Sequence, residues 1–337
     1  MAGVTKLLQF FSTAALTQVV LMLSQLILLP IQIRLWGHSA TAAWYSAVAL
    51  ATITTVVDCG LRTAGHAELM RCMSRPAGEL AARDYFRQVW AWIRILVSVV
   101  TVLLITGDCF FTTMILGHPY PFWKAALILA YALETVLIIR IMYLDTLGFY
   151  RGAEVSYFIF AALRLALAVP ALLLFRLGAN GLAWLFLLTS ALALALQGRL
   201  LCRRITLLSI LAAPPRKLSF RILAVARHTV AEPCANWVRL SLPVLVIAAI
   251  STPAAVNTYV ALRAAFGAGR TTIQQLSRVA SVEYLRFRAD RRSAAAESLL
   301  SIFVALAGLI GTGVAAFIVA DNMRILGLWL AHFDRSL

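Results

Sequence analysis

Apolar runs about as long as a bilayer is thick recur along this chain. A helix needs about 20 mostly apolar residues to cross the hydrocarbon core of a membrane. Hydrophobic residues make up 62% of the chain, and the mean hydropathy is +0.87, both high for a soluble domain. The candidate spans are 7–33, 39–57, 88–107, 123–144, 155–175, 177–198, 222–250, 254–272 and 298–320. The sequence therefore predicts an all-α, polytopic membrane protein.

The connections between these spans carry their own signals. Ser251, Thr252 and Pro253 predict a tight turn between two helices. The stretches 61–87 and 273–297 mix arginine with apolar residues, which predicts amphipathic helices on the membrane surface. No cleavable signal peptide is expected, because the first apolar run is too long and lacks a following small-residue cleavage site.

Positive charge is distributed unevenly along the chain. The net charge is +16, and most of the 30 lysines and arginines lie in one set of loops and ends that includes 61–87, 199–227 and 263–292. Loops rich in Lys and Arg stay cytoplasmic, so we expect a cytoplasmic N-terminus and, after nine crossings, an outside C-terminus. A nucleic-acid partner is not expected, because the basic residues are divided among loops that lie between spans. Cysteines and histidines are scattered, so neither a metal site nor a cofactor is predicted.

Three arginines interrupt apolar runs: Arg94, Arg164 and Arg239. A cation near the bilayer centre costs about 2.5–3.5 kcal/mol on the insertion scale, and such residues usually face a protein interior or a wet cavity. We therefore interpret the three as candidates for binding an anionic substrate in a cavity. The alternative is that each pairs with a carboxylate or a backbone carbonyl and only joins helices.

The carboxylates within the spans are few, and two of them are candidates for ion coupling. Glu134 lies in the middle of its run, where desolvation raises a carboxyl pKa and allows it to carry a proton. It equally suits the role of partner to an arginine. Glu232 lies seven residues before Arg239, on the same helical face and about 10 Å away, which predicts a pair.

Glutamines recur every seven residues along the first run, at Gln18, Gln25 and Gln32. Residues at this spacing share one helical face. Gln18 and Gln25 are therefore candidates for contacting sugar hydroxyls in a cavity. Hydrogen bonds between helices are the equal alternative.

Two hairpins of the chain resemble each other weakly. Residues 44–50 follow Pro30 and a short turn, and residues 258–262 follow Pro243 and a short turn. Both hairpins are expected to start on the inside, which is typical of a parallel repeat in a two-lobed transporter. We therefore predict a six-helix lobe over 1–205, a basic cytoplasmic linker over 206–221, and an incomplete second lobe of about three helices over 222–337.

The first hairpin also carries a recognisable motif. It resembles the start of the polysaccharide (O-antigen, Wzx-like) flippases of the multidrug/oligosaccharidyl-lipid/polysaccharide exporter superfamily. The residues that carry the likeness are Leu29-Pro30, Gly37, Trp44-Tyr45 and Asp58-Cys59-Gly60-Leu61, with 255–259 and Arg263 resembling the second lobe. Thr41 and Ala42 stand where Tyr-Gly is common, and Cys59 replaces the usual Leu. Such proteins typically have twelve or more helices, so the chain looks like a truncated member.

Within this motif, three residues are interpreted as structural. Asp58 is expected to anchor a loop as a hydrogen-bond acceptor, next to Gly60. Pro30 is expected to kink its helix, because proline lacks the amide hydrogen that the helical ladder needs.

The resemblance implies a two-lobed, MATE-like bundle that flips a lipid-linked oligosaccharide across the bacterial inner membrane. This cargo, an undecaprenyl-diphosphate-linked oligosaccharide, serves the biosynthesis of lipopolysaccharide and other envelope or exopolysaccharides. The implied partners are the cargo, the bilayer and other polysaccharide assembly proteins. Guanidinium forks suit the diphosphate, because they bind phosphate oxygens bidentately.

Three alternatives remain at this stage. The first is a multidrug or cation antiporter of the same superfamily, for which an acidic cavity is expected. The second is a membrane-embedded polymerase or glycosyltransferase, which usually carries catalytic residues on a large outside loop. The outside loops here are short, and we expect no enzyme activity. The third is an inactive, truncated relic.

Overall fold

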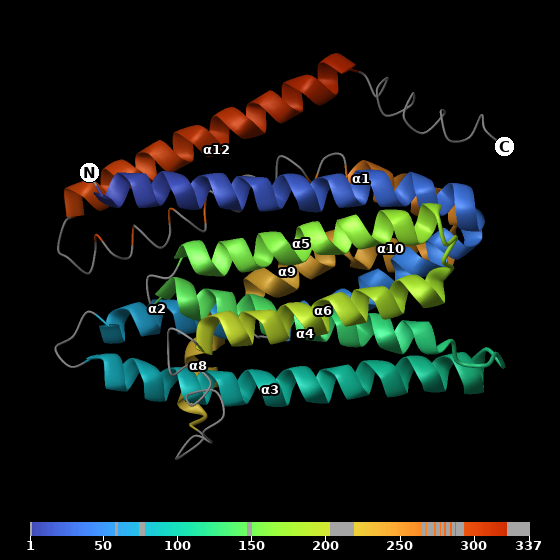
Figure 1. Cartoon of the computed structure of the whole chain (residues 1–337), viewed down its shortest axis with the longest axis horizontal. Helices are drawn as coiled ribbons and strands as arrows, with labels where there is room; N and C mark the ends of the chain where they lie inside the picture. The colour runs from blue at the N-terminus through green and yellow to red at the C-terminus, as the bar shows by residue number, and fades with distance from the viewer. Residues whose placement is uncertain are drawn as a thin grey trace.

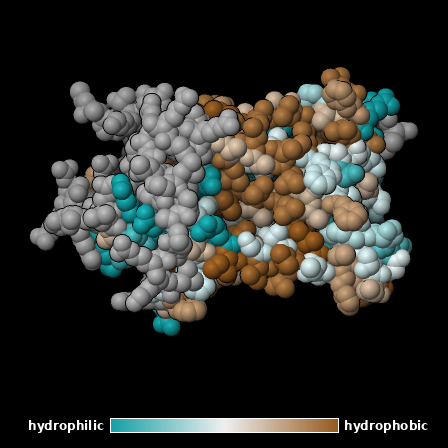
Figure 2. Space-filling view, turned by 60° about the horizontal axis from the view of Figure 1, so that its bottom comes forward, coloured by the Kyte–Doolittle hydropathy of each residue, from teal (hydrophilic) through white to brown (hydrophobic). Residues whose placement is uncertain are grey.

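The structure is a computed structural model that describes residues 2–57, 60–73, 78–146, 150–202, 219–264 and 293–321, with isolated positions at 267, 273, 277, 280, 284 and 287. Regular structure in these residues is helical throughout. Long helices run side by side along the long axis of the molecule (Figure 1). An apolar belt crosses the middle of its surface, between more hydrophilic ends (Figure 2). Among the described residues, seven helices are long and apolar enough to cross a membrane, so the chain is a multi-pass membrane protein.

The first helix, α1 (Ala2–Ala51), is two helices joined at a sharp turn. Gly37 at this turn has φ 77° and ψ 173°, a conformation that essentially only glycine adopts. The two predicted spans 7–33 and 39–57 are thereby confirmed as one hairpin, which a short 3-10 helix, η1 (Thr52–Thr55), extends. Pro30 lies buried within the first half of α1. Neighbouring helices can shield a proline break of this kind within a membrane.

The next helices complete an N-terminal bundle, defined here as α1 to α6. Spans 88–107, 123–144, 155–175 and 177–198 are confirmed with small shifts of their ends. The bounds are α2 (Leu61–Met73), α3 (Gly78–Phe110) with its π-helical end η2 (Phe111–Ile115), α4 (Phe122–Thr146), α5 (Tyr150–Leu173) and α6 (Ala179–Cys202).

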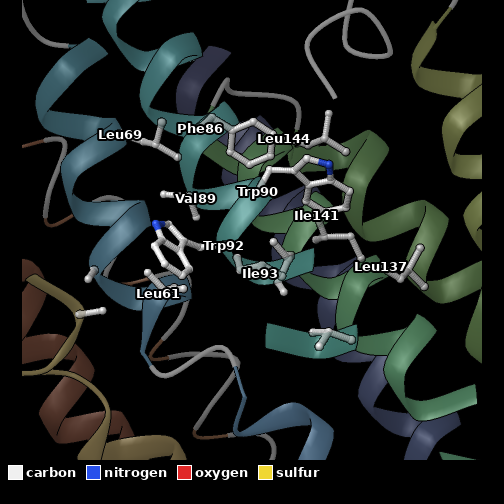
Figure 3. Packing of buried hydrophobic residues seen from close by; sticks show 14 of the residues in the cluster. Leu61, Leu69, Phe86, Val89, Trp90, Trp92, Ile93, Leu137, Ile141 and Leu144 are labelled. Atoms are coloured by element: carbon white, nitrogen blue, oxygen red, sulfur yellow. The ribbon is translucent and has the colours of Figure 1, made fainter. Parts of the chain in front are cut away.

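The composition of the basic stretch 61–87 predicts amphipathic helices on the membrane surface. The described part of this stretch does not form a single helix of that kind. It divides into α2 and the first turns of α3, and these two helices pack along each other (Figure 1). Leu61 and Leu69 of α2 are almost fully buried against α3. In Figure 3, Trp92 points from α3 toward Leu61, while Trp90 lies against Leu144 and the α4 side. The stretch 273–297 falls largely outside the described residues.

The predicted span 222–250 is broken rather than continuous. It forms α8 (Arg221–Ala226), a turn, α9 (Ala231–Leu240) and α10 (Leu242–Ile250). The break at Ser241 arises because Pro243, at the start of α10, lacks the amide hydrogen that would continue the ladder. Ser251 is extended and residues 253–264 are again helical, which confirms the predicted turn. We call α9, α10 and 253–264 the second hairpin.

The last described helix, α12 (Ser293–Asp321), contains the predicted span 298–320 and crosses the molecule at an angle (Figure 1). Its large apolar side chains, including Ile302, Val304 and Leu309, are exposed, as expected for a surface that contacts lipid. The predicted linker 206–221 lies mainly outside the described residues. The division into two lobes therefore stays a prediction.

Candidate functional site

The arginine in the middle of α5 lies against a carboxylate from α4. Arg164 Nη1 is 2.9 Å from Glu134 Oε2, and Nη2 donates to Ser190 Oγ of α6 at 2.8 Å. The two charged side chains are nearly sealed, with 12% and 13% of their surface exposed. Because Arg164 has no carboxylate three, four or seven residues away, its partner has to come from another helix. Three helices are joined at this one point.

Aromatic rings surround the same cation. The Arg164 Cζ lies 4.3 Å from the centroid of the Phe160 ring and 4.6 Å from that of Phe186. Tyr157 donates a long hydrogen bond, 3.5 Å, to Glu134 Oε1. Aromatic faces attract a guanidinium, so these rings replace water around it.

This geometry favours the pairing alternative for both charged residues. Breaking a buried ion pair by removing one partner leaves an uncompensated charge, which is strongly unfavourable. Arg164 in this arrangement cannot reach a substrate without leaving Glu134. Substrate binding by Arg164 and ion coupling by Glu134 stay predictions.

The N-terminal bundle meets the second hairpin through single hydrogen bonds and small side chains; we call this contact the junction. Thr52 Oγ1 and Ser241 Oγ are 2.9 Å apart, and Trp237 Nε1 donates to the Ala49 carbonyl at 3.3 Å. The packed side chains are small or branched: Leu29, Ile33, Ala42, Ala49, Val244, Val256, Val260 and Ala261. The two weakly similar hairpins of the sequence therefore pack directly against each other.

Two further contacts close the junction near the two ends of the second half of α1. Asn257 Nδ2 donates to the His38 carbonyl at 3.0 Å, beside the turn at Gly37. Thr229 Oγ1 donates to the Gly60 carbonyl at 2.9 Å. Gly60 has φ 75°, and a Cβ there would lie 2.6 Å from the Thr229 carbonyl carbon. Only glycine fits at this close approach of two backbones.

Arg263 ties together two parts of the second hairpin, although the sequence argument quoted it only within a motif and assigned it no role. Its Nη1 donates to the Leu240 carbonyl at 2.6 Å, at the end of α9. Carbonyls released by the break at Pro243 need partners inside a membrane, and a cation suits the negative end of a helix. Arg263 also interacts electrostatically with Tyr45 and Tyr131 of the N-terminal bundle. Arg263 also interrupts an apolar run, 254–272, so the criterion that selected Arg94, Arg164 and Arg239 would have selected Arg263 too.

Arg94, in contrast, lies on the exposed side of α3. Its Cζ is 5.8 Å from the centroid of the Trp90 ring, and Arg140 of α4 is 5.4 Å from the same ring. Arg140 Nη1 also donates to the Leu194 carbonyl at 3.3 Å. The structure does not bring Arg94 together with Arg164 or with Arg239.

Arg239 and Glu232 are both exposed on α9. The pair predicted from their spacing is wrong, because no ion pair joins these two described side chains. Residues seven apart share a face but lie two turns away from each other, whereas residues three or four apart are neighbours. Arg239 is thus an exposed arginine without an ion pair to Glu232. It lies two residues along the chain from Trp237 and from Ser241, which are both part of the junction.

The remaining candidates lie on the first hairpin. Gln25 is exposed and Gln32 is buried. The helical face that they share is therefore exposed at Gln25 and packed against neighbouring residues at Gln32. The side chain of Gln18 and all of Asp58 fall outside the described residues. Gly60 lies at the close backbone approach described above, and the kink predicted at Pro30 stays a prediction.

No protein-family model matches the chain, and no curated protein matches its sequence. Among solved structures, the chain is similar to the crystal structure of a eukaryotic MATE transporter, AtDTX14. The two align over 94% of this chain and 73% of that one, with a TM-score of 0.63 and 14% sequence identity. This likeness confirms the predicted fold class, an all-α, MATE-like helix bundle.

Proposed function

We propose that the protein is a transporter that moves a lipid-linked oligosaccharide across the bacterial inner membrane by alternating access, with its N-terminus in the cytoplasm. The MATE-like fold carries this proposal, because a MATE transporter shares it. The junction supports it physically. The junction is held by apolar contacts and single hydrogen bonds, so two helix groups can separate there without breaking a buried ion pair such as the one that joins α4 to α5.

The charges within the spanning helices support an anionic cargo. Five arginines lie in or beside the apolar parts of the described helices, namely Arg94, Arg140, Arg164, Arg239 and Arg263, whereas Glu134 and Glu232 are the carboxylates near the bundle interior and the junction. Glu134 is already neutralised by Arg164. The remaining positive charge near the junction comes from Arg239 and Arg263. A diphosphate head group would offset it, and guanidinium groups bind phosphate bidentately. The proposal includes no covalent chemistry on the cargo.

A second candidate function is the export of cationic compounds. It is supported by Glu232, an exposed carboxylate on α9 that forms no ion pair with Arg239. An uncompensated carboxylate of this kind can bind a cation or a proton.

The two functions can be tested with one reconstituted protein. Proteoliposomes would contain a fluorescent polyprenyl-diphosphate oligosaccharide, and the fraction reaching the opposite leaflet would be measured with a membrane-impermeant quencher. We expect the wild-type chain to accelerate flipping and Arg239→Gln to slow it about tenfold, because a charge-assisted contact is lost. Arg34→Gln, which removes an exposed charge from α1, is the matched control and should flip normally.

The same vesicles can be loaded with a cationic dye. Dye export that depends on Glu232, together with no acceleration of flipping, would refute the glycan cargo and support the cation antiporter. Absence of both activities in correctly folded protein would refute transport by this chain.

A further inference from the structure

The exposed side of α3 is a mainly apolar stripe that begins after Arg94. The buried side of the same helix packs into the bundle, with Trp90, Ile93 and Val97 facing inward. α3 lies at the lower edge of the bundle in Figure 1 and comes toward the viewer in Figure 2, where the apolar belt crosses the visible face. The exposed apolar residues are Ile95, Val99, Val102, Leu103, Phe110, Phe111, Met114, Ile115 and Leu116. This stripe therefore faces lipid.

The length of the stripe determines how deep Arg94 lies. From Ile95 to Leu116 the rise is about 32 Å at 1.5 Å per residue. The hydrocarbon core of a bilayer is about 30 Å thick, so this stretch is long enough to cross it. Asp108, which pairs with Lys124 of α4 at 3.2 Å, lies 14 residues or about 21 Å beyond Arg94 and marks the far side. Toward the helix start, Asp84 is exposed and Arg87 is partly exposed. Arg94 thus lies in the half of the membrane that is nearer to the start of α3.

Arg140 lies at the same depth on the neighbouring helix. It follows Phe122, the first residue of the α4 span, by 18 positions, or about 27 Å. Both guanidinium groups contact the Trp90 ring, so their Cζ atoms are at most about 11 Å apart. A buried tryptophan at this depth orients the two cations, because an indole face attracts them and its ring favours the membrane interface.

The nearby described carboxylates are engaged elsewhere. Asp84 pairs with Arg87 at 3.2 Å, and Glu134 pairs with Arg164 at 2.9 Å. No ion pair joins Arg94 to any carboxylate that the structure describes. An exposed guanidinium therefore faces the bilayer on the side nearer to the helix start, without an ion pair to any carboxylate that the structure describes.

We propose that Arg94, supported by the charge of Arg140 and oriented by Trp90, binds the phosphate head group of a membrane lipid. Helical side chains point toward the helix start, so the Arg94 guanidinium extends from its backbone toward the head groups. The phosphate can belong to a resident anionic phospholipid or to a polyprenyl diphosphate. This site lies on the outer edge of the bundle, away from the junction, and does not depend on the proposed transport function.

Lipid binding to the purified full chain can be measured directly by native mass spectrometry from detergent. The chain would be titrated with phosphatidylglycerol, with a polyprenyl diphosphate, and with a phosphate-free glycosyl diacylglycerol of matched acyl chains. We expect Arg94→Gln to weaken phosphate-lipid binding about tenfold, the loss of a charge-assisted hydrogen bond. Arg94→Lys should bind with intermediate affinity, because it keeps the charge and loses the fork.

Arg34→Gln is again the matched control, because it removes an exposed charge far from this ring. Loss of phosphatidylglycerol binding in Arg94→Gln identifies a resident phospholipid site. Loss restricted to the polyprenyl diphosphate identifies capture of that lipid. Equal binding by wild type, Arg94→Gln and Arg34→Gln, or equal binding of the phosphate-free lipid, would overturn the proposal whatever the flipping assay shows. A melting curve of Arg94→Gln, compared with that of the wild type, would check that the variant is folded.

Discussion

The interior of the N-terminal bundle and the junction with the second hairpin are built by different means. The interior holds a buried ion pair enclosed by aromatic rings and two large apolar clusters. The junction holds a smaller cluster of aliphatic side chains, single hydrogen bonds from hydroxyl, indole and amide groups, and the close backbone approach at Gly60. The first is suited to remain fixed, and the second is suited to separate.

The difference follows from the energetics of packing in a membrane. Lipid is as apolar as leucine, so burial of apolar surface between helices contributes little there, and polar contacts and close packing decide which helices stay together. Glu134 and Arg164 therefore join α4 to α5 more firmly than hydroxyl contacts join the bundle to α10. A transporter that moves groups of helices past each other needs contacts within each group that are stronger than the contacts between the groups.

Loss of the interior ion pair should have the largest effect. Arg164→Met leaves Glu134 charged and buried, and we expect a loss of about 3–5 kcal/mol in stability. Thermal unfolding in detergent, followed by size-exclusion chromatography, measures it. The double variant Glu134→Gln with Arg164→Met should recover most of the loss, because no uncompensated charge remains. A single variant as stable as wild type would mean that the pair does not hold the interior.

Gly60→Ala should have the next largest effect. A positive φ costs a non-glycine residue about 1–2 kcal/mol. The clash with the Thr229 backbone adds about 1–3 kcal/mol. Gly117→Ala is a matched control, because Gly117 also has a positive φ, 66°, but has nothing within 4 Å of its Cβ position. If the two variants lose the same amount of stability in thermal unfolding, the backbone approach at the junction is not tight.

Asn257→Leu should loosen the junction without affecting the interior. It removes the hydrogen bond to the His38 carbonyl, worth about 1 kcal/mol, which corresponds to about fivefold more opening. Hydrogen–deuterium exchange should rise in residues 253–264 and stay unchanged in α4 and α6. Faster exchange in all three regions would contradict a junction that opens independently.

Arg94→Gln should have the smallest effect on stability. Arg94 is exposed and forms no ion pair with a described carboxylate. Substitution of such a residue usually changes the free energy of unfolding by no more than about 0.5 kcal/mol. Its melting temperature should match that of wild type, in contrast to Arg164→Met. A loss comparable to that of Arg164→Met would show that Arg94 is part of the packed structure and not of its lipid-facing edge.

The pattern of residues along the chain was enough to predict the helices and some of their turns. Apolar length predicted the spans, because a bilayer imposes one length on every crossing. Gly37 and Pro253 marked real turns, because backbone conformation at glycine and proline is a local property. The MATE-like architecture is what the resemblance of the motif around Pro30 and Gly37 to a known family implies. Pro243 can kink a helix, but the span 222–250 was predicted as one helix and is broken at Ser241.

The roles of the arginines were decided only by the tertiary structure. Arg94 and Arg164 have the same local context, a cation within an apolar run without a carboxylate on its own helix. The fold places Arg164 opposite Glu134 of another helix and leaves Arg94 exposed on the outer side of α3. Depth and partner depend on how helices are arranged around each other, which the local sequence does not contain. The surrounding charge, and hence the chemistry available to each guanidinium, is a property of that arrangement.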